Sequence, residues 1–415
     1  MPGENSISQS QRKNLPHIVT NLDQLNPVSM MGGLFKFISK PQAYNIPTSN
    51  KYHTIQPITT VSTNAFTGSN YFFDFNIPMD IDMINEQFLE LALLNTSSTT
   101  DWAAKASLPF WIQRIEIRHN GEIKQTLRDI HLYMDNTIYR NDFEREKLVP
   151  LVGINKDTYK ADSATLTVLQ GGGTNVFRLK INSILARCQL FIKALKGQIV
   201  VRVYPQAISV FSNSTANSSI QLQTATLLIE ENELTPDACE KLKSIHRSNV
   251  DYRFLDVIDE QAVLTLTSGT TTKYVTNNFY DQVYSHLVVL TRANNASNED
   301  LEIFVKHNNV YVEDVSSTNL SNGIQWTDDQ LRKVVYTSNF PNSMSLQTDM
   351  NVYVPLAPSS DCEASYKKGV NAGFDILPRN CKICISAASS ATYQVDILCY
   401  AYLHVRVQDG AFAIL

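Results

Sequence analysis

The sequence has few charged residues and lacks the usual signs of a membrane-spanning or secreted chain. Only 18% of its 415 residues are charged, and the formal net charge is −5. Extensive phosphate contacts need clustered Lys and Arg, so this balance argues against direct nucleic-acid binding. No apolar run reaches the roughly 18 residues that a membrane-spanning helix needs. Residues 1–14 lack an apolar signal core, so we expect the protein to be made and kept in the cytosol.

Cysteine is sparse, which argues against a disulfide scaffold. The six cysteines are scattered through a long chain, so we expect reduced thiols. Cys381 and Cys384 form a CxxC motif, but it lies in the strand-like run 380–386. Positions three apart on a strand point to opposite faces. The motif is therefore expected to be structural and not a redox or zinc site.

Motifs that carry catalysis are also missing. No two of the eight histidines lie within five positions of each other, whereas strand-borne metal sites need paired histidines. The sequence has no nucleophile elbow, HExxH or Rossmann fingerprint, and the glycines at 171–173 lack a following Gly-Lys-Ser/Thr. Acidic pairs such as Asp80 and Asp82 are weak signals in an acidic chain. Trp102, Trp111 and Trp326 do not cluster in the sequence. We predict no catalytic, cofactor-binding or metal-binding residue.

The most informative feature that is present is an internal repeat. Three landmarks recur in the same order, about 190 to 200 residues apart, which predicts two copies of one β-domain. The first is an aromatic segment followed by a strand, the second a His-Asn turn, and the third an Ile-Leu run before a cysteine. They occupy 71–75 with 88–93, 118–121 and 184–188 in the first half, and 273–276 with 287–290, 306–309 and 376–381 in the second. We interpret His119 and His307 as equivalent hairpin corners.

Short β-rich segments alternate with turn residues from Tyr52 onward, as in a β-sandwich. The clearest hairpin joins 112–118 to 123–127 through Asn120-Gly121, a pair that suits a type I′ turn. Its alternation predicts one buried face, with Ile115 and Ile117, and one solvated face with Arg114, Glu116 and Arg118. Further strands are expected at 176–181, 190–192, 198–204 and 221–230.

The most helical part of the chain links the two halves. Thr235 offers an N-cap hydroxyl, and Pro236 suits the first helical position. Short charged helices are also expected at 144–147 and 327–332. We predict an N-terminal arm at 1–50, a first β-domain at 51–233, a helical linker at 234–250 and a second β-domain at 251–415.

The segment Phe110–Ile123 resembles the hairpin region of double jelly-roll major capsid proteins, in which an aromatic and aliphatic run leads into an alternating strand and a tight Gly-containing turn. The opening strands at 52–57, 71–77 and 88–94 and the crossing at 234–255 are also similar. The pattern looks most like capsid proteins of virophages, polintons and polinton-like viruses. It departs from many relatives in having Asn120-Gly121 where they have Gly-Gly, but both pairs suit the same turn.

The resemblance implies an all-β fold of two tandem eight-stranded antiparallel jelly rolls with a few short helices. It implies a non-enzymatic major capsid protein whose homotrimers form pseudo-hexagonal capsomers in an icosahedral shell, located in the virion. Penton and minor capsid proteins would be further partners, and contact with an inner membrane is left open. The alternatives are a glycan-binding or spike-type β-sandwich and a double-jelly-roll enzyme that cleaves glycans. The enzyme would need a carboxylate pair in a Trp-lined cleft at the domain seam.

Overall fold

The fold is described from a computed structural model of the chain. The structure describes residues 48–68, 70–136, 152–153, 168–247, 250–277, 283–294, 300–322, 324–325, 351–355 and 380–414. The helices expected at 144–147 and 327–332 lie outside these residues, as does almost all of the expected N-terminal arm.

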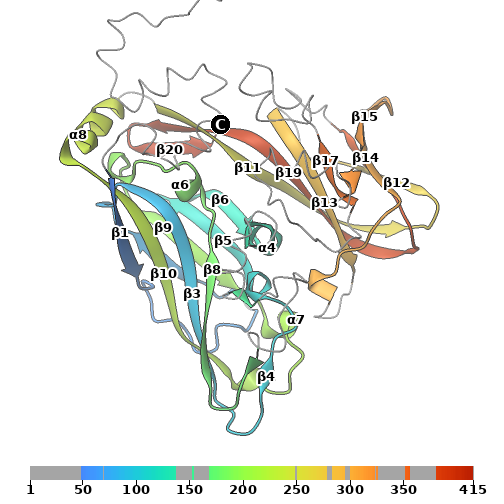
Figure 1. The fold of residues 1–415 in the computed structure, drawn as a ribbon, viewed down its shortest axis with the longest axis horizontal. Coiled ribbons are helices and arrows are strands. Elements are labelled where there is room, and N and C mark those ends of the chain that lie inside the picture. The colour runs from blue at the N-terminus through green and yellow to red at the C-terminus, as the bar shows by residue number, and fades with distance from the viewer. Residues whose placement is uncertain are drawn as a thin grey trace, which may run out of the picture.

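The first half of the chain folds into two four-stranded antiparallel sheets (Figure 1). One sheet has the order β1-β10-β3-β8 and the other β2-β9-β5-β6. The strands are β1 (Thr48–Ile55), β2 (Phe73–Ile77), β3 (Met83–Asn95), β5 (Ile112–His119), β6 (Glu122–Arg128), β8 (Thr174–Lys180), β9 (Ile199–Pro205) and β10 (Ile220–Leu234). A small extra sheet pairs β4 (Trp102–Ala103) with β7 (Val168–Leu169).

The second half repeats this plan. One sheet contains β11-β19-β13-β17, extended by β16 and β20, and the other has the order β12-β18-β14-β15. The strands are β11 (Val250–Leu266), β12 (Thr271–Val275), β13 (Val283–Ala293), β14 (Asn309–Glu313), β15 (Asn319–Asn322), β16 (Ile324–Gln325), β17 (Asn351–Pro355), β18 (Lys382–Ser386), β19 (Ala391–Gln408) and β20 (Ala411–Ile414).

The two halves match strand for strand. The first, last, third and sixth of the eight main strands form one sheet of each half, and the second, seventh, fourth and fifth form the other. This order is that of a jelly roll, in which two four-stranded antiparallel sheets pack face to face. The predicted pair of eight-stranded antiparallel jelly rolls is confirmed. The repeat is therefore real at the level of topology.

Alternation of apolar and polar residues explains how each sheet is buried. In β3, Leu89, Leu91 and Leu93 are buried between the sheets, while Phe88 and Glu90 lie on the half-exposed outer face. Burying each such leucine contributes roughly 1.5 to 3 kcal/mol. A one-residue slip of this strand against β10 would put all three leucines outside, so the pattern fixes the register.

The predicted hairpin is confirmed, with one correction. Asn120 and Gly121 have φ of 52° and 86°, as a type I′ turn between β5 and β6 requires. Glu116, however, is buried and not solvated. Arg114 and Arg118 each donate from Nε to one of its carboxylate oxygens at 2.9 Å. Burial raises the pKa of Glu116, but these two hydrogen bonds outweigh it and leave the pKa lowered.

The interpretation of His119 and His307 as equivalent corners is wrong. His119 ends β5 and leads into the β5–β6 turn, whereas His307 lies just before β14, the strand that corresponds to β5. The true counterpart of the Asn120-Gly121 turn is the β14–β15 connection, where Ser317 has a φ of 63°. Short turn strings resemble each other because turns share residue preferences, and that resemblance does not make them homologous positions.

The prediction of a strand at 190–192 is also wrong. Gln189 has a φ of 46°, and the chain then turns back so that the Leu190 amide donates to Leu185 O at 3.2 Å. Only a single bridge, between Phe191 and Met83, has strand geometry, and the 3₁₀ turn η5 (Ile192–Ala194) follows. A short buried apolar run does not by itself distinguish a strand from a packed turn.

The linker helix α8 (Pro236–Ile245) forms as expected, but the side chain of Thr235 makes no capping hydrogen bond. Leu242 packs with Met83, Phe191, Leu234 and Cys239 in a small cluster that fixes the helix to the first jelly roll. The other short helical segments are η3 (Leu108–Trp111), α4 (Asp129–Asn136), α6 (Ile184–Arg187), α7 (Ile208–Phe211), η6 (Asn217–Ser219) and η7 (Asp300–Glu302).

Candidate functional site

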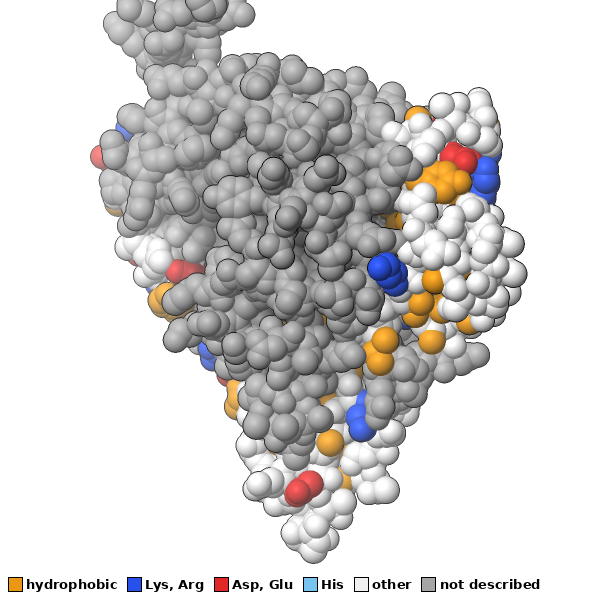
Figure 2. Space-filling model, turned by 45° about the vertical axis from the view of Figure 1, so that its right-hand side comes forward, with side chains coloured by type: hydrophobic (Ala, Val, Ile, Leu, Met, Phe, Trp, Pro, Cys, Tyr) orange, Lys and Arg blue, Asp and Glu red, His pale blue; other side chains and the backbone are white. Residues whose placement is uncertain are grey.

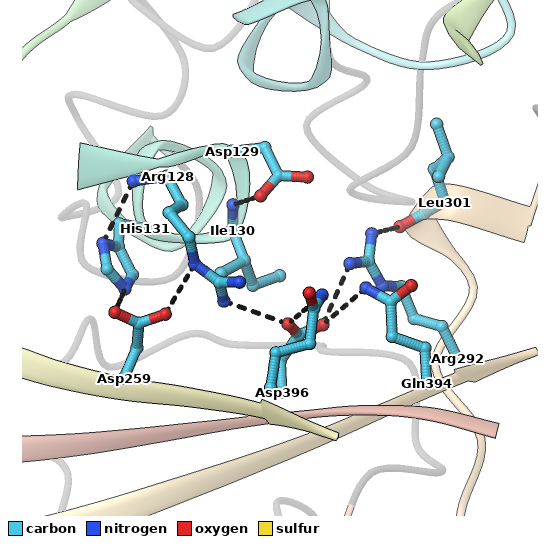
Figure 3. Close-up of polar contacts among 10 residues, drawn as sticks. Arg128, Asp129, Ile130, His131, Asp259, Arg292, Leu301, Gln394 and Asp396 are labelled. Atoms are coloured by element: carbon cyan, nitrogen blue, oxygen red, sulfur yellow. Dashed lines mark hydrogen bonds and ion pairs between the residues drawn. The ribbon is translucent and has the colours of Figure 1, made fainter. Parts of the chain in front are cut away.

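The junction between β6 and α4 aims polar side chains at the second jelly roll. Asp129 begins the helix, and its Oδ1 accepts a hydrogen bond from the Ile130 amide at 2.8 Å. The Arg128 amide donates to His131 Nδ1 at 3.2 Å. Figure 3 shows the side chains of Arg128 and His131 reaching from this junction toward Asp259 and Asp396. We call this contact region between the two jelly rolls the seam.

Asp396, on β19, is the centre of the seam. It is completely buried and lies between two guanidinium groups, one from each jelly roll. Arg128 Nη2 donates to its Oδ1 at 3.1 Å, and Arg292 Nη2 donates to its Oδ2 at 2.9 Å. Gln261 Nε2 adds a hydrogen bond at 3.1 Å. Arg128 Nε also pairs with Asp259 Oδ2 at 2.5 Å. Arg128 therefore contacts both β11 and β19 of the second jelly roll.

A second ionic cluster lies around Arg187, at the end of α6. Its Nη2 pairs with Asp135 Oδ2 on α4 at 3.0 Å, and its Nη1 pairs with Asp256 Oδ1 on β11 at 3.3 Å. Gln125 Nε2 donates to Asp256 Oδ2 at 2.7 Å, while Gln125 Oε1 accepts from the Ile184 amide at 2.7 Å. Asp256 therefore receives hydrogen bonds from two elements of the first jelly roll.

The loops beside these clusters add backbone and aromatic contacts. The Ser107 amide donates to Glu302 Oε1 at 2.8 Å, and both residues are buried. The Arg292 guanidinium lies 5.6 Å from the ring centroid of Phe110. Tyr133 and Phe304 pack with their ring centroids 5.8 Å apart. The Ser107 amide and the Glu302 carboxylate are thus paired and lie near apolar side chains, the condition under which buried polar groups are tolerated.

The C-terminal hairpin closes the other end of the seam. Strand β20 pairs with the end of β19 and lies against the first jelly roll. Gly410 O accepts a hydrogen bond from the Lys196 amide at 2.7 Å. The ring of Phe412 stacks on His119 at 5.1 Å between centroids, with the planes 18° apart. A few residues at the chain end thereby bind the β5–β6 turn of the other domain.

The electrostatics of the seam keep the arginines charged and the histidine neutral. Burial alone would lower the pKa of Arg128, but Asp259 and Asp396 raise it. Burial, with Arg128 and Arg187 nearby, lowers the pKa of His131 to about 3. Burial raises the pKa of Asp259, against the opposing charge of Arg128. The arrangement is suited to holding two domains at a fixed angle, because removing one partner would leave an unpaired buried charge.

The motifs considered in the sequence do not gather at the seam. Among the described residues, no group of three or more His, Cys, Asp or Glu side chains could hold a metal ion. Cys381 and Cys384 are buried free thiols, as expected, and the Cys381 thiol lies 3.0 Å from Thr276 Oγ1. No helix of the described part of the chain is long and apolar enough to cross a membrane. The prediction of no catalytic, cofactor or metal residue stays a prediction.

Comparisons with known proteins identify the fold through structure alone. No family model and no curated protein matches the sequence. Among solved structures, the PBCV-1 virus capsid matches with a TM-score of 0.61 at 11% identity, covering 89% of this chain and 97% of that chain. The Faustovirus major capsid protein matches with a TM-score of 0.55 at 9% identity over 88% and 91% of the two chains. The major capsid protein of Sulfolobus Turreted Icosahedral Virus (STIV) matches at 0.51 and 10% identity over 85% and 96%. This chain has the double jelly-roll fold.

The double jelly roll does bring carboxylates together at the seam, as the enzyme alternative requires, but not beside tryptophan. Trp102 lies in the core of the first jelly roll, edge-on to Trp111 at 5.5 Å, and its indole N–H donates to Asn217. Trp326 lies outside the described residues. An open cavity of about 370 Å³ is lined by Phe66, Ile208 and other first-domain residues, none of them acidic. The glycan-cleaving cleft therefore has no support from the described residues.

Proposed function

We propose that this double jelly-roll chain is a viral major capsid protein, and that three copies form a pseudo-hexagonal capsomer that tiles an icosahedral shell. The proposal rests on the strand-for-strand match of the two halves. Each chain has two similar jelly rolls, so a trimer would have six, which suits a pseudo-hexagonal outline. The solved structures that share the fold over nearly the whole chain are viral capsid proteins, which supports the same function.

The seam supports this function physically. A tile in a shell must keep its shape while neighbours press against it, and the seam joins the jelly rolls through buried ion pairs centred on Asp396 and Asp256. Closed homo-oligomers with stable interfaces commonly bury about 2,000 Å² or more. We propose that the outer faces of the sheets and the loops between strands supply that area.

The surface charge supports an architectural role without direct nucleic-acid binding. In the face drawn in Figure 2, the Lys and Arg side chains of the described residues stand apart from one another, and some of them lie beside Asp or Glu. Salt-sensitive phosphate binding needs such groups to cluster. We propose a virion location after synthesis in the host cytoplasm, with penton and minor capsid proteins as partners. The units would be the arm 1–50, the jelly rolls 51–233 and 251–415, and the linker 234–250.

Sedimentation and electron microscopy of the purified full chain test the proposal. A sedimentation coefficient that corresponds to three chains at micromolar concentration, with hexagonal outlines in negative stain, is the expected result. A protein that stays monomeric and gives no particles when expressed with partner capsid proteins would contradict it. A glycan array with the same protein is the control for the glycan-binding alternative, which requires saturable and selective binding.

A further inference from the structure

Three histidines lie at contacts between the first jelly roll, the linker helix and the second jelly roll. They are His131 in α4, His119 at the end of β5 and His246 at the end of α8. Each touches a residue of the second jelly roll, although none of the three is in that domain. Histidine is the side chain whose ordinary pKa places its charge change in mildly acidic solution. Their shared position makes the seam a place where proton uptake would act.

His131 is the most constrained of the three. Its Nδ1 accepts from the Arg128 amide, so the proton of the neutral ring is on Nε2, which lies 3.6 Å from Asp259 Oδ1. The charged groups around it are the guanidinium groups of Arg128 on β6 and Arg187 on α6, and the carboxylate of Asp259 on β11. Asp259 is already paired with Arg128. Protonation would place a second ring proton on Nδ1, opposite the Arg128 amide that now donates to it, and would add a positive charge beside the two guanidinium groups.

His246 is held in one neutral tautomer by its two hydrogen bonds. Its Nδ1 lies 2.7 Å from Leu242 O, which can only accept, so Nδ1 carries the proton. Its Nε2 lies 2.7 Å from Tyr252 Oη, so Nε2 accepts and the Tyr252 hydroxyl donates. The ring also packs on Phe191 of the first jelly roll. A proton on Nε2 would turn this nitrogen into a donor, so the Tyr252 hydroxyl would have to reorient and accept at the contact between the linker and β11.

His119 lies beneath the C-terminal hairpin. Its Nε2 donates to Lys196 O at 2.8 Å, and the ring is stacked on Phe412. Burial and Lys124 on β6 disfavour its charged form, while Glu122 and the bond to Lys196 favour it. The amide of the same Lys196 donates to Gly410 of the second jelly roll. His119 therefore supports the residue that makes a backbone bond across the seam.

We propose that the seam is a pH-sensitive joint: in mildly acidic solution, proton uptake by His131, with His119 and His246, parts the two jelly rolls while each stays folded. This inference does not depend on the capsid assignment. At pH 5, a pKa for His131 of about 3 in the closed seam against 6.5 in the open one favours opening roughly thirty-fold.

The buried carboxylates of the seam act in the opposite direction. Burial raises the pKa of Asp129, Asp256 and Asp259, so their protonation favours the closed seam as the pH falls. Arg187 and Arg128 oppose that protonation by pairing with Asp256 and Asp259. The histidines favour opening below their ordinary pKa of 6.5, whereas the carboxylates favour closing below their raised pKa in the closed seam, so the two contributions overlap on acidification. Replacing the histidines separates the two contributions.

Hydrogen exchange of two backbone amides reports directly on the joint. The Ser107 amide donates to Glu302 and the Lys196 amide to Gly410, so both are protected only while the seam is closed. Amides in the β3–β10 pairing of the first jelly roll serve as the internal control. The full chain is compared at pH 7.5 and pH 5.0, after correction for the intrinsic pH dependence of exchange.

Each test variant keeps one hydrogen bond of its histidine while removing the titrating ring. In His131→Asn the amide oxygen replaces Nδ1 as acceptor, in His246→Asn the amide nitrogen replaces Nδ1 as donor, and in His119→Gln the amide nitrogen replaces Nε2 as donor. The matched control is His307→Gln, because the His307 ring is also buried but packs on Tyr393 in its own jelly roll.

At pH 5.0 the parent and His307→Gln should lose at least tenfold protection at the seam amides and keep it in β3–β10. The variant that carries all three substitutions, His131→Asn, His246→Asn and His119→Gln, should keep its seam protection. Equal seam protection of the parent at both pH values would overturn the proposal. So would equal loss in the parent and the triple variant, or loss that affects the seam and β3–β10 alike. If the triple variant does not fold, His131→Asn alone must remove most of the loss of seam protection that the parent shows at pH 5.0.

Discussion

Arg128 donates from Nη2 to Asp396 Oδ1 at 3.1 Å across 268 positions of sequence, and so joins the last strand of one jelly-roll sheet to the centre of a sheet in the other. Asp396 is completely buried and also pairs with Arg292. One carboxylate thus compensates two guanidinium groups at a domain boundary. The rigidity that we propose for the capsid tile depends on contacts of this kind.

Asp396→Asn should destabilise the protein by about 3 to 5 kcal/mol, because it leaves Arg128 and Arg292 partly uncompensated in a buried site. Urea unfolding at neutral pH measures the change. Glu240→Gln is the control, since Glu240 pairs with Lys243 on the exposed face of α8 and such pairs contribute little. Similar behaviour of the two variants would show that the Asp396 pairs do not hold the seam.

Gly121→Ala should lower the thermal midpoint, because Gly121 has a φ of 86° and a side chain there costs about 1 to 2 kcal/mol. A Cβ at this position would meet no atom within 4 Å, so the cost is backbone strain and not a clash. Gly121→Asn should cost less, since asparagine accepts positive φ more readily. If alanine is tolerated as well as glycine, the type I′ turn is not the solution conformation.

Cys384 should react with thiol reagents only in strongly alkaline solution. Burial, then the nearby charge of Glu313, raises the pKa of its thiol to about 11, and the thiolate is the reactive form. Alkylation followed by peptide mass spectrometry, as a function of pH, gives the profile. The protein unfolded in denaturant is the control and should react near the ordinary thiol pKa. Rapid labelling of Cys384 or a bond to Cys381 in the folded protein at pH 7 would revive a redox role.

His307 should make the second jelly roll acid-sensitive. Burial lowers its pKa from 6.5 to about 4, so the neutral ring is the form that the fold accepts. Because the pKa is lowered, the contribution of the neutral ring to the unfolding free energy is fully present above pH 6.5. It is lost as the pH falls toward 4, and amounts to at most about 3 kcal/mol. His307→Gln should flatten the dependence of the unfolding free energy on pH over this window. An unchanged slope would mean that the ring is not buried in solution.

Local patterns in the sequence predicted much of the architecture. The Asn120-Gly121 turn, the alternation in β3 and the linker helix after Thr235 each depend on a few neighbouring residues, and each forms as expected. The errors occur where distant residues decide the conformation. Glu116 accepts a hydrogen bond from the hydroxyl of Tyr204, which is 88 positions away on a neighbouring strand, in addition to those from Arg114 and Arg118. The chain turns at 190–192, where Phe191 forms a bridge with Met83 and the Ile192 amide donates to Asp82 O.

The seam was the part of the molecule that sequence reasoning missed. A signal was present, since Asp256 and Asp396 each lie between two apolar residues of a strand, and a buried acid needs a partner. The identity of that partner could not be read from spacing. Arg128 and Asp396 meet only after each half has folded and the two have docked.

The sequence alone determined that the chain would form two similar β-domains joined by a helix, because strand alternation, turn residues and helix capping act over a few positions. The tertiary structure decided which polar residues are buried, how the jelly rolls are joined and where His119, His131 and His246 lie. Those outcomes depend on desolvation and charge pairing between groups more than a hundred residues apart, such as Arg128 with Asp259 and Asp396, which no local pattern encodes.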